Sequence, residues 1–299
     1  MLEVKHLRKT FGDLVAVDDL NFTIKPGEIM GLIGKNGSGK TTTFRIILKL
    51  MPSDSGEVFW NGEPIDEKLY NHLGFLPEER GLDPKQTIEE QILFFAELRG
   101  KKPSEIRPKI DEWLDRFQVK GKKTDLIKTL SKGNQQKVQV ITTLIHEPDF
   151  IVLDEPFSGL DPVNAELLEQ GIREASERGA AIIFSSHNMN NVEELCDTLI
   201  MIQDGVQRLS GKVRDIRNSY GRTELFLESD LTMQEIEAVE GVESIDMVDE
   251  DVYKIHLSDE AVGHKIFTLA NKDGFIPTFS QQPPSLDTIF KRIAGEKNE

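Results

Sequence analysis

One short glycine-rich segment constrains this sequence more than any other. Residues Gly34-Lys35-Asn36-Gly37-Ser38-Gly39-Lys40-Thr41 follow the pattern G-x-x-x-x-G-K-[S/T]. The segment comes directly after an apolar run at 28–33, which predicts a buried strand, and before a helical pattern at 40–50. A strand, a glycine-rich turn and a helix in this order predict an α/β fold.

The same segment has the chemistry to hold a chain of phosphates. Glycines let backbone N–H groups turn inward around a β-phosphate, and the N-terminus of the next helix adds partial positive charge. Lys40 would reach the β- and γ-phosphates, and Thr41 would ligate Mg²⁺. The alternative, a glycine-rich turn with an exposed lysine, leaves the flanking strand and helix unexplained. We therefore expect the nucleotide to bind Gly34, Asn36, Gly37, Ser38, Gly39, Lys40, Thr41 and Thr42.

A second acidic motif follows another apolar strand. The run at 150–153 ends in Asp154-Glu155. Carboxylates at the end of a buried strand are costly unless a cation or hydrogen bonds compensate them, and a Mg²⁺–nucleotide would supply that compensation. We expect Asp154 to hold the metal through water and Glu155 to polarise the attacking water.

The pattern of apolar runs predicts two domains. The first covers 1–211. Its strands are expected at 2–7, 20–24, 28–33, 57–60, 73–76, 150–153, 181–185 and 198–202, and its helices at 40–50 and 163–178. Residues 87–146 change to helical patterns at 87–99, 104–117 and 131–146 and look like a helical insertion. Strands that alternate with helices predict a mainly parallel sheet covered on both faces.

The order of elements changes after a predicted linker at 212–221. Strands are expected at 224–228, 242–248, 252–257 and 275–280, with helices at 232–239 and 261–272 and a hairpin turn across 249–251. A last helix at 285–294 follows a Pro-Pro pair. The order βαββαβ predicts a small α+β domain of the ferredoxin-like type over 222–299.

Charge and composition narrow the class of partner. The net charge is −16, and 18 acidic but only 8 basic side chains lie between Asp215 and Glu299, so we expect no nucleic-acid partner. No apolar run approaches the ~18 residues of a membrane span, and no signal peptide is visible. Cys196 is the one cysteine, which excludes an internal disulfide.

A third motif connects the first two to a known family. Leu130-Ser131-Lys132-Gly133-Asn134-Gln135-Gln136-Lys137 resembles the LSGGQ signature of ABC ATPases. Other matches occur in the family's order: Phe11 as an adenine-stacking aromatic, Glu78 at the Q-loop, 158–161 as the D-loop and His187 as the switch histidine. The resemblance implies an ABC cassette over 1–211, which is a P-loop NTPase with a mainly parallel sheet, an antiparallel β portion and a helical insertion.

The resemblance also implies roles for individual residues. The catalytic set would be Glu155, His187, Lys40 and Asp161, with Ser131, Gly133 and Gln135 also binding nucleotide and with Thr41, Asp154 and Glu78 at the metal. Two departures stand out. The signature reads Ser-Lys-Gly-Asn where the family has Ser-Gly-Gly-Gln, and Glu78 replaces the usual glutamine.

The tail is similar to the small C-terminal domain of ATPases that serve ABC-2-type exporters of the sodium and drug-efflux group, including Pro283-Pro284 and the helix after it. This implies an ATP-hydrolysing subunit on the cytoplasmic face of the membrane. A separate integral membrane permease would dock near the Glu78–Leu82 loop, where Glu79 and Arg80 are exposed-loop residues, and near the helical insertion. One phosphate loop and one signature per chain imply a head-to-tail homodimer or heterodimer through the ATP sites.

Two other functions remain open from the sequence. One is a soluble ABC ATPase with a non-transport role such as cofactor assembly, which copurification with membranes would separate from an exporter subunit. The other is a regulatory module that holds ATP without turnover; the presence of Glu155 and His187 disfavours it. Phe94-Phe95 could belong to a docking groove, but we expect core packing because adjacent aromatics cannot share one helix face.

Overall fold

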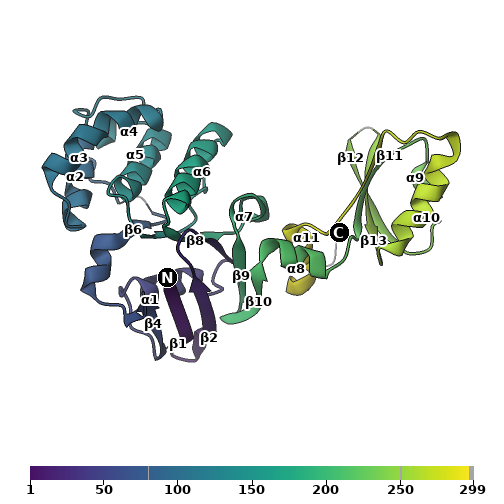
Figure 1. Cartoon of the computed structure of the whole chain (residues 1–299), viewed down its shortest axis with the longest axis horizontal. Helices are drawn as coiled ribbons and strands as arrows, with labels where there is room; N and C mark the ends of the chain where they lie inside the picture. Colours follow the sequence, from purple (N-terminus) through teal and green to yellow (C-terminus); the bar gives the residue numbers. More distant parts are fainter. Residues whose placement is uncertain (80, 250, 296–299) are drawn as a thin grey trace. The chain divides into compact units, whose positions relative to one another are not determined.

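A computed structural model describes residues 1–79, 81–249 and 251–295. The chain forms two compact units, Met1–Ser210 and Gly211–Glu299, which follow one another along the colour scale of Figure 1. Two residues named in the sequence predictions, Arg80 of the expected docking loop and Glu250 of the expected hairpin turn, lie outside the described residues.

The first unit is built on a ten-stranded sheet with the order β5-β4-β1-β2-β10-β9-β3-β8-β7-β6. The strands are β1 (Leu2–Phe11), β2 (Leu14–Ile24), β3 (Ile29–Ile33), β4 (Ser55–Trp60), β5 (Glu63–Pro64), β6 (Leu73–Leu76), β7 (Phe150–Leu153), β8 (Ala181–Ser186), β9 (Thr198–Gln203) and β10 (Val206–Lys212). The pairs β1–β2, β1–β4 and β4–β5 are antiparallel, whereas β3 pairs with β8 and β9, and β7 with β6 and β8, in parallel. The predicted α/β fold with an antiparallel portion is confirmed.

Burial explains why the two portions differ. Every residue of β3, β7 and β8 is buried, as expected for parallel strands covered on both faces. β1 instead mixes buried and exposed positions, and β4 has only half-buried and exposed ones, which is typical of strands with one face toward solvent. The core joins Phe44 and Ile47 of the first helix to residues such as Leu32 and Val152 on the parallel strands.

Seven α-helices of this unit are described: α1 (Lys40–Ile47), α2 (Ile88–Leu98), α3 (Pro103–Ile106), α4 (Ile110–Arg116), α5 (Lys132–Leu144), α6 (Pro162–Glu177) and α7 (Met189–Leu195). Short 3₁₀ turns lie at Glu67–His72, Arg107–Lys109 and Ile127–Thr129. Figure 1 shows α2 to α5 gathered in one helical cluster, where the insertion was predicted. The helix predicted at 104–117 is interrupted at Arg107–Lys109 because Pro108 has no N–H to donate.

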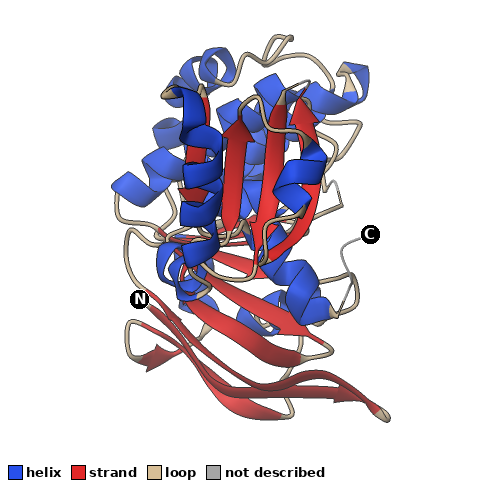
Figure 2. Cartoon of the chain, turned by 90° about the vertical axis from the view of Figure 1, so that its right-hand side faces the viewer, coloured by secondary structure: helices blue, strands red, loops and turns tan. Residues whose placement is uncertain are grey.

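The second unit has a four-stranded antiparallel sheet with the order β12-β13-β11-β14 (Figure 2). Its strands are β11 (Glu224–Glu228), β12 (Val242–Asp249), β13 (Val252–Leu257) and β14 (Thr278–Gln282); its helices are α8 (Val213–Ser219), α9 (Met233–Glu237), α10 (Ala261–Ala270) and α11 (Leu286–Ala294), with a 3₁₀ turn at Asn271–Asp273. Ile236 of α9 and Ile266 of α10 share one core with Leu225 and Ile255 of the sheet. The predicted βαββαβ order is confirmed.

The predicted linker at 212–221 is structured. β10 extends to Lys212, and α8 follows directly. Val213 and Ile216 are buried, and the Arg217 guanidinium donates to the carbonyls of Pro284 at 3.0 Å and Pro283 at 3.2 Å. These long-range bonds are invisible in the local sequence pattern, which reads as a polar connection.

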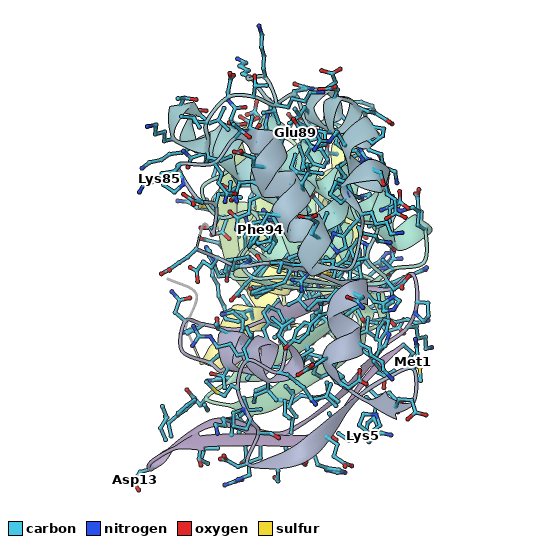
Figure 3. All side chains as sticks on the ribbon, turned by 90° about the vertical axis from the view of Figure 1, so that its left-hand side faces the viewer. Met1, Lys5, Asp13, Lys85, Glu89 and Phe94 are labelled. Carbon is cyan, nitrogen blue, oxygen red and sulfur yellow. The ribbon has the colours of Figure 1, made fainter. Side chains whose placement is uncertain are left out.

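Two apolar side chains on α2 face solvent. Phe94 is 46% exposed and Leu98 is 55% exposed, and residues four apart share a helix face. The core packing expected for Phe94 is therefore wrong; Figure 3 labels it on this helix. Among the described residues, no helix combines the length and the apolarity needed to cross a bilayer.

Candidate active site

The glycine-rich loop joins β3 to α1 and is wedged between two neighbouring segments. Gly39 has φ +108°, and a Cβ there would lie 2.2 Å from the carbonyl oxygen of Ala16 on β2. On the other side the N–H of Gly205, in the turn between β9 and β10, donates to the Ser38 carbonyl at 3.2 Å. Position 39 therefore requires glycine, because any other residue would be strained at this φ and its Cβ would clash with the Ala16 carbonyl.

Lys40 is buried and folds back onto the loop. It is 6% exposed, and its Nζ donates to the carbonyls of Gly34 at 2.7 Å and Lys35 at 3.2 Å. Burial lowers the pKa of Lys40. The exposed lysine of the alternative interpretation is absent here. Ser38 Oγ is also buried and has no hydrogen-bond partner among the described residues, so the loop has desolvated groups that an anion would satisfy.

Asp154 lies at the end of β7, facing the loop. It is 5% exposed and accepts hydrogen bonds from Ser185 Oγ at 2.6 Å and Thr41 Oγ1 at 3.2 Å. Ser185 reaches it because β8 runs beside β7 in parallel, with Phe184 opposite Leu153. The first residue of the predicted acid pair is therefore tied to both the phosphate loop and the next strand.

Glu155 has a left-handed backbone with φ +47°, an uncommon conformation for a residue with a side chain. Its N–H donates to Ser185 Oγ at 2.8 Å, and its Oε2 lies 2.8 Å from Nδ1 of His187. Its Oε1 is buried without a partner in the described part of the chain. Strain of this kind clusters at functional sites. The sequence reasoning missed Ser185, although its place two residues before His187 was a signal.

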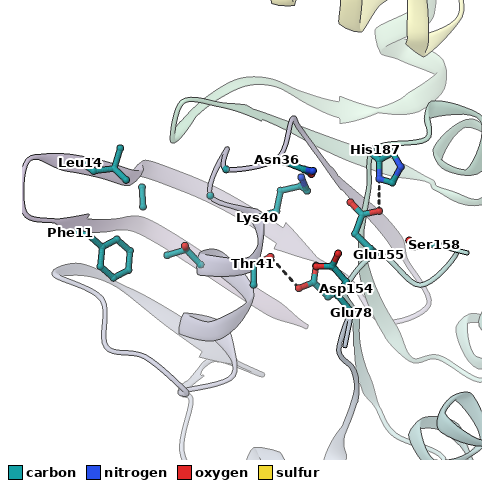
Figure 4. A pocket seen from close by; sticks show the side chains of 14 residues that line it. Phe11, Leu14, Asn36, Lys40, Thr41, Glu78, Asp154, Glu155, Ser158 and His187 are labelled. Atoms are coloured by element: carbon teal, nitrogen blue, oxygen red, sulfur yellow. Dashed lines mark hydrogen bonds and ion pairs between the residues drawn. The ribbon is translucent and has the colours of Figure 1, made fainter. Parts of the chain in front are cut away.

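These groups line one cavity of about 620 Å³. Its walls are Phe11, Leu14, Ala16, Asn36, Gly37, Gly39, Lys40, Thr41, Thr42, Glu78, Asp154, Glu155, Ser158 and His187. Figure 4 shows Phe11 and Leu14 at one end, the Glu155–His187 pair at the other, and Lys40 and Thr41 between them. The structure thus brings together the predicted aromatic, phosphate-loop, acidic and switch residues, while Gly34 and Ser38 shape the loop outside the lining.

Besides Gly34 and Ser38, four predicted residues do not line this cavity: Ser131, Gly133, Gln135 and Asp161. Ser131 is the N-cap of α5, and Asp161 is the N-cap of α6, where it accepts from the N–H of Asn164 at 2.9 Å. Gln135 Nε2 donates to the carbonyls of Ile127 and Leu130, which holds the turn before α5. Asn164 Nδ2 lies 3.3 Å from the position of a Cβ on Gly133, so the ends of α5 and α6 adjoin. We call Ser131, Lys132, Gly133, Asn134 and Asp161 the signature surface.

Comparison with known proteins finds similarity to ABC transporter ATP-binding proteins along both units of the chain. The profile of the ABC transporter family matches residues 17–158, and that of the ATP-binding protein DrrA1-3-like C-terminal domain matches residues 211–294. The chain is 40% identical over 299 residues to the ABC transporter ATP-binding protein YhaQ of Bacillus subtilis (strain 168), covering 99% of both. It is 29% identical to the Nod factor export ATP-binding protein I of Sinorhizobium fredii (strain NBRC 101917 / NGR234), covering 99% of this chain and 86% of that one.

A related cassette has been solved as a dimer. The ATP-binding cassette MJ0796, in a dimeric post-hydrolysis state bound to ADP and Pi, aligns with a TM-score of 0.63 and 26% identity. The alignment covers 71% of this chain and 98% of that one.

Proposed function

The chain belongs to the ABC transporter ATP-binding family, and from this membership we propose that its ATP hydrolysis drives export through a separate integral membrane permease. The family establishes ATP binding and hydrolysis. The observation that carries the ATPase part of the proposal, a site completed by a second cassette, is the division of the predicted site. One cavity holds the phosphate loop with Asp154, Glu155 and His187, while the signature surface lies outside it.

Within one chain the cavity supports the binding of ATP. Phe11 is 47% exposed at the end of the cavity opposite the acids and offers a ring face to adenine (Figure 4). The loop N–H groups and Lys40 receive the phosphates. Glu155, whose Oε1 has no partner within the described residues, accepts a proton from the attacking water, and His187 orients the Glu155 carboxylate through Oε2.

Mg²⁺ fits the oxygen donors at the phosphate end. Thr41 Oγ1 and Asp154 Oδ2 lie 3.2 Å apart and are hard ligands of the kind that Mg²⁺ prefers, with Glu78 also on the wall. No cluster of three His, Cys, Asp or Glu able to hold a metal exists in the described residues. Phosphate oxygens of the nucleotide and water would complete the ligand set, as is usual for Mg²⁺. When bound, the ion neutralises the developing charge on the phosphates.

A second cassette completes the site. Ser131 and Gly133 would offer a hydroxyl and a backbone N–H to the γ-phosphate held by the partner's loop, in a two-fold head-to-tail dimer. Asp161 adjoins Gly133 through Asn164, so the same surface would carry the D-loop residue. The dimeric state of the related cassette MJ0796 supports this arrangement.

The test is the variant Glu155→Gln. Because the amide cannot accept the water proton, ATP should remain bound and the chain should become a dimer with ATP and stay a monomer with ADP. Size-exclusion chromatography with light scattering measures this. A variant that stays monomeric with ATP and hydrolyses it normally would contradict the roles assigned to Glu155 and to the second cassette.

The relative named for Nod factor export supports a role in export. We propose that the permease docks near the Glu78–Leu82 loop and α2, at the cytoplasmic face of the membrane, where Phe94 and Leu98 are exposed. Copurification of a membrane protein with the full chain should be lost on Glu79→Ala/Phe94→Ala and kept on Phe275→Ala, an even more exposed aromatic in the other unit. Equal recovery with both variants would refute this docking surface.

A further inference from the structure

The signature surface contains a residue that departs from the family pattern and whose side-chain oxygen and nitrogen both form hydrogen bonds. Asn134 stands where the family has glutamine. It occupies the first turn of α5, three residues after the N-cap Ser131. The half-buried Asn134 side chain bonds in two directions, whereas Ser131 is exposed.

The orientation of the Asn134 amide is fixed by a backbone group. The N–H of Lys120 donates to Asn134 Oδ1 at 3.0 Å. A backbone N–H can only donate, so it must face the amide oxygen, and a flipped amide would lose this bond. The Nδ2 of Asn134 is therefore directed to the other side, where it lies 3.1 Å from Ser131 Oγ.

Ser131 Oγ thus receives two donors. Besides Nδ2, the backbone N–H of Asn134 donates to it at 3.3 Å. A hydroxyl has two acceptor sites and one proton. With both acceptor sites engaged, the one function left to Ser131 is to donate its proton outward.

The charge around this hydroxyl favours an anionic acceptor. Lys132 is exposed at the first position of α5, and that turn contains no acidic residue. The carboxylate of the signature surface, Asp161, accepts hydrogen bonds from the backbone N–H and Nδ2 of Asn164 as the N-cap of α6. The helix N-terminus adds partial positive charge. A donor-only hydroxyl in this setting matches a phosphate oxygen and cannot serve a ligand that needs an acceptor.

We propose that Asn134 is a positioning residue that fixes Ser131 as a donor to the γ-phosphate of ATP held by the opposing cassette. This inference rests on the proposed function, because the acceptor belongs to the nucleotide of the second cassette. It assigns to the asparagine a task distinct from packing: the choice of which way one proton points.

Asn134→Asp tests this task without removing a cap. An aspartate can still accept from the Lys120 N–H, and a carboxylate in the first turn suits the helix dipole, so the thermal unfolding temperature should not fall. Its second oxygen would accept a hydrogen bond from the Ser131 hydroxyl, so that the hydroxyl proton would point toward residue 134 and away from the nucleotide. In full-length Glu155→Gln protein, the ATP concentration that gives half dimer should rise about tenfold or more.

A double-mutant cycle with Ser131→Ala separates proton direction from added charge. If Asn134 acts through the hydroxyl, Asn134→Asp should raise the ATP concentration that gives half dimer much less in the Ser131→Ala background than with Ser131 present. The same cost in both backgrounds would overturn the inference and indicate simple repulsion. A Glu155→Gln dimer unaffected by Asn134→Asp would overturn the inference alone. No ATP-dependent dimer of Glu155→Gln at all would overturn the proposed function and this inference with it.

Discussion

Each unit contains a glutamate with little exposure to solvent, Glu155 with a side chain 11% exposed and Glu224 with one 3% exposed, and the surroundings of the two differ. In the cassette, Glu155 has one oxygen bonded to His187 and the other without a partner among the described residues, on the wall of a cavity. In the second unit, Glu224 is 3% exposed, accepts from Thr288 Oγ1 at 2.6 Å and lies 3.1 Å from Lys254 Nζ. Glu155 therefore has a carboxylate oxygen without a hydrogen-bond partner in the described residues, whereas Glu224 is compensated by a hydroxyl and a cation.

The contrast separates two uses of a buried charge. A compensated carboxylate joins elements: Thr288 belongs to α11, so Glu224 of β11 ties that helix to the sheet. An incompletely satisfied carboxylate on a left-handed backbone carries a cost that function must justify. Substitutions at the first kind of site should change stability, and those at the second kind should change turnover.

The largest effect is expected at Glu155. Glu155→Gln keeps the shape of the side chain but cannot accept the water proton, so phosphate release at saturating ATP should fall by about 10²–10⁴-fold. Thermal unfolding of the variant should remain that of the wild type. Normal turnover would show that Glu155, like Glu224, has a structural role, and would remove the proposed difference between the two residues.

The second effect should fall on stability alone. Glu224→Ala leaves Lys254 and Thr288 without their acceptor and should destabilise the second unit by about 3 kcal/mol. Amide hydrogen exchange in the full chain should accelerate in β11 and α11. Phosphate release should not change; a loss as large as that of Glu155→Gln would contradict the structural role.

A third buried titratable group sharpens the contrast through pH. His146 is 3% exposed, its Nε2 lies 3.0 Å from the Leu73 carbonyl, and burial lowers its pKa to about 4. Below the unfolded pKa of about 6.5 the unfolded chain takes up a proton that the folded chain excludes. Stability should therefore fall as the pH decreases from 6.5 toward 4, by about 2 kcal/mol between pH 7 and pH 5.

Urea denaturation at both pH values measures this loss, and His146→Gln should remove it. The relevant quantity is the difference between variant and wild type, since other groups also titrate. Equal pH dependence in both proteins would exclude His146 as the source.

The smallest effect is expected at Ser185, which positions both acids. Ser185→Ala removes the donor to Asp154 and the acceptor for the Glu155 N–H, so kcat should fall roughly tenfold with little change in KM for ATP. Ser186→Ala is the matched control, because the Ser186 hydroxyl bonds only with the backbone of Asn188 in the described contacts. Equal losses in both variants would argue for a general packing defect.

Local patterns predicted the parts of the site that local chemistry defines. The glycine-rich loop needs its glycines within eight residues, and Asp154-Glu155 follows an unmistakable apolar strand. Ser185 was missed because a serine at a strand end is ordinary until the β7–β8 register places it beside two acids. Helix α8 was missed because the bonds from Arg217 reach residues 66 and 67 positions away.

The placement of Gly39 against Ala16 has a consequence for the order in which this protein is made. The β1–β2 hairpin that supplies Ala16 is complete before the loop is synthesised, whereas the turn at Gly205 emerges some 170 residues after it. During synthesis on a ribosome, the loop can therefore contact Ala16 at once, but the contact with Gly205 can form only much later. A nascent chain should therefore bind nucleotide only when synthesis of the cassette is almost finished.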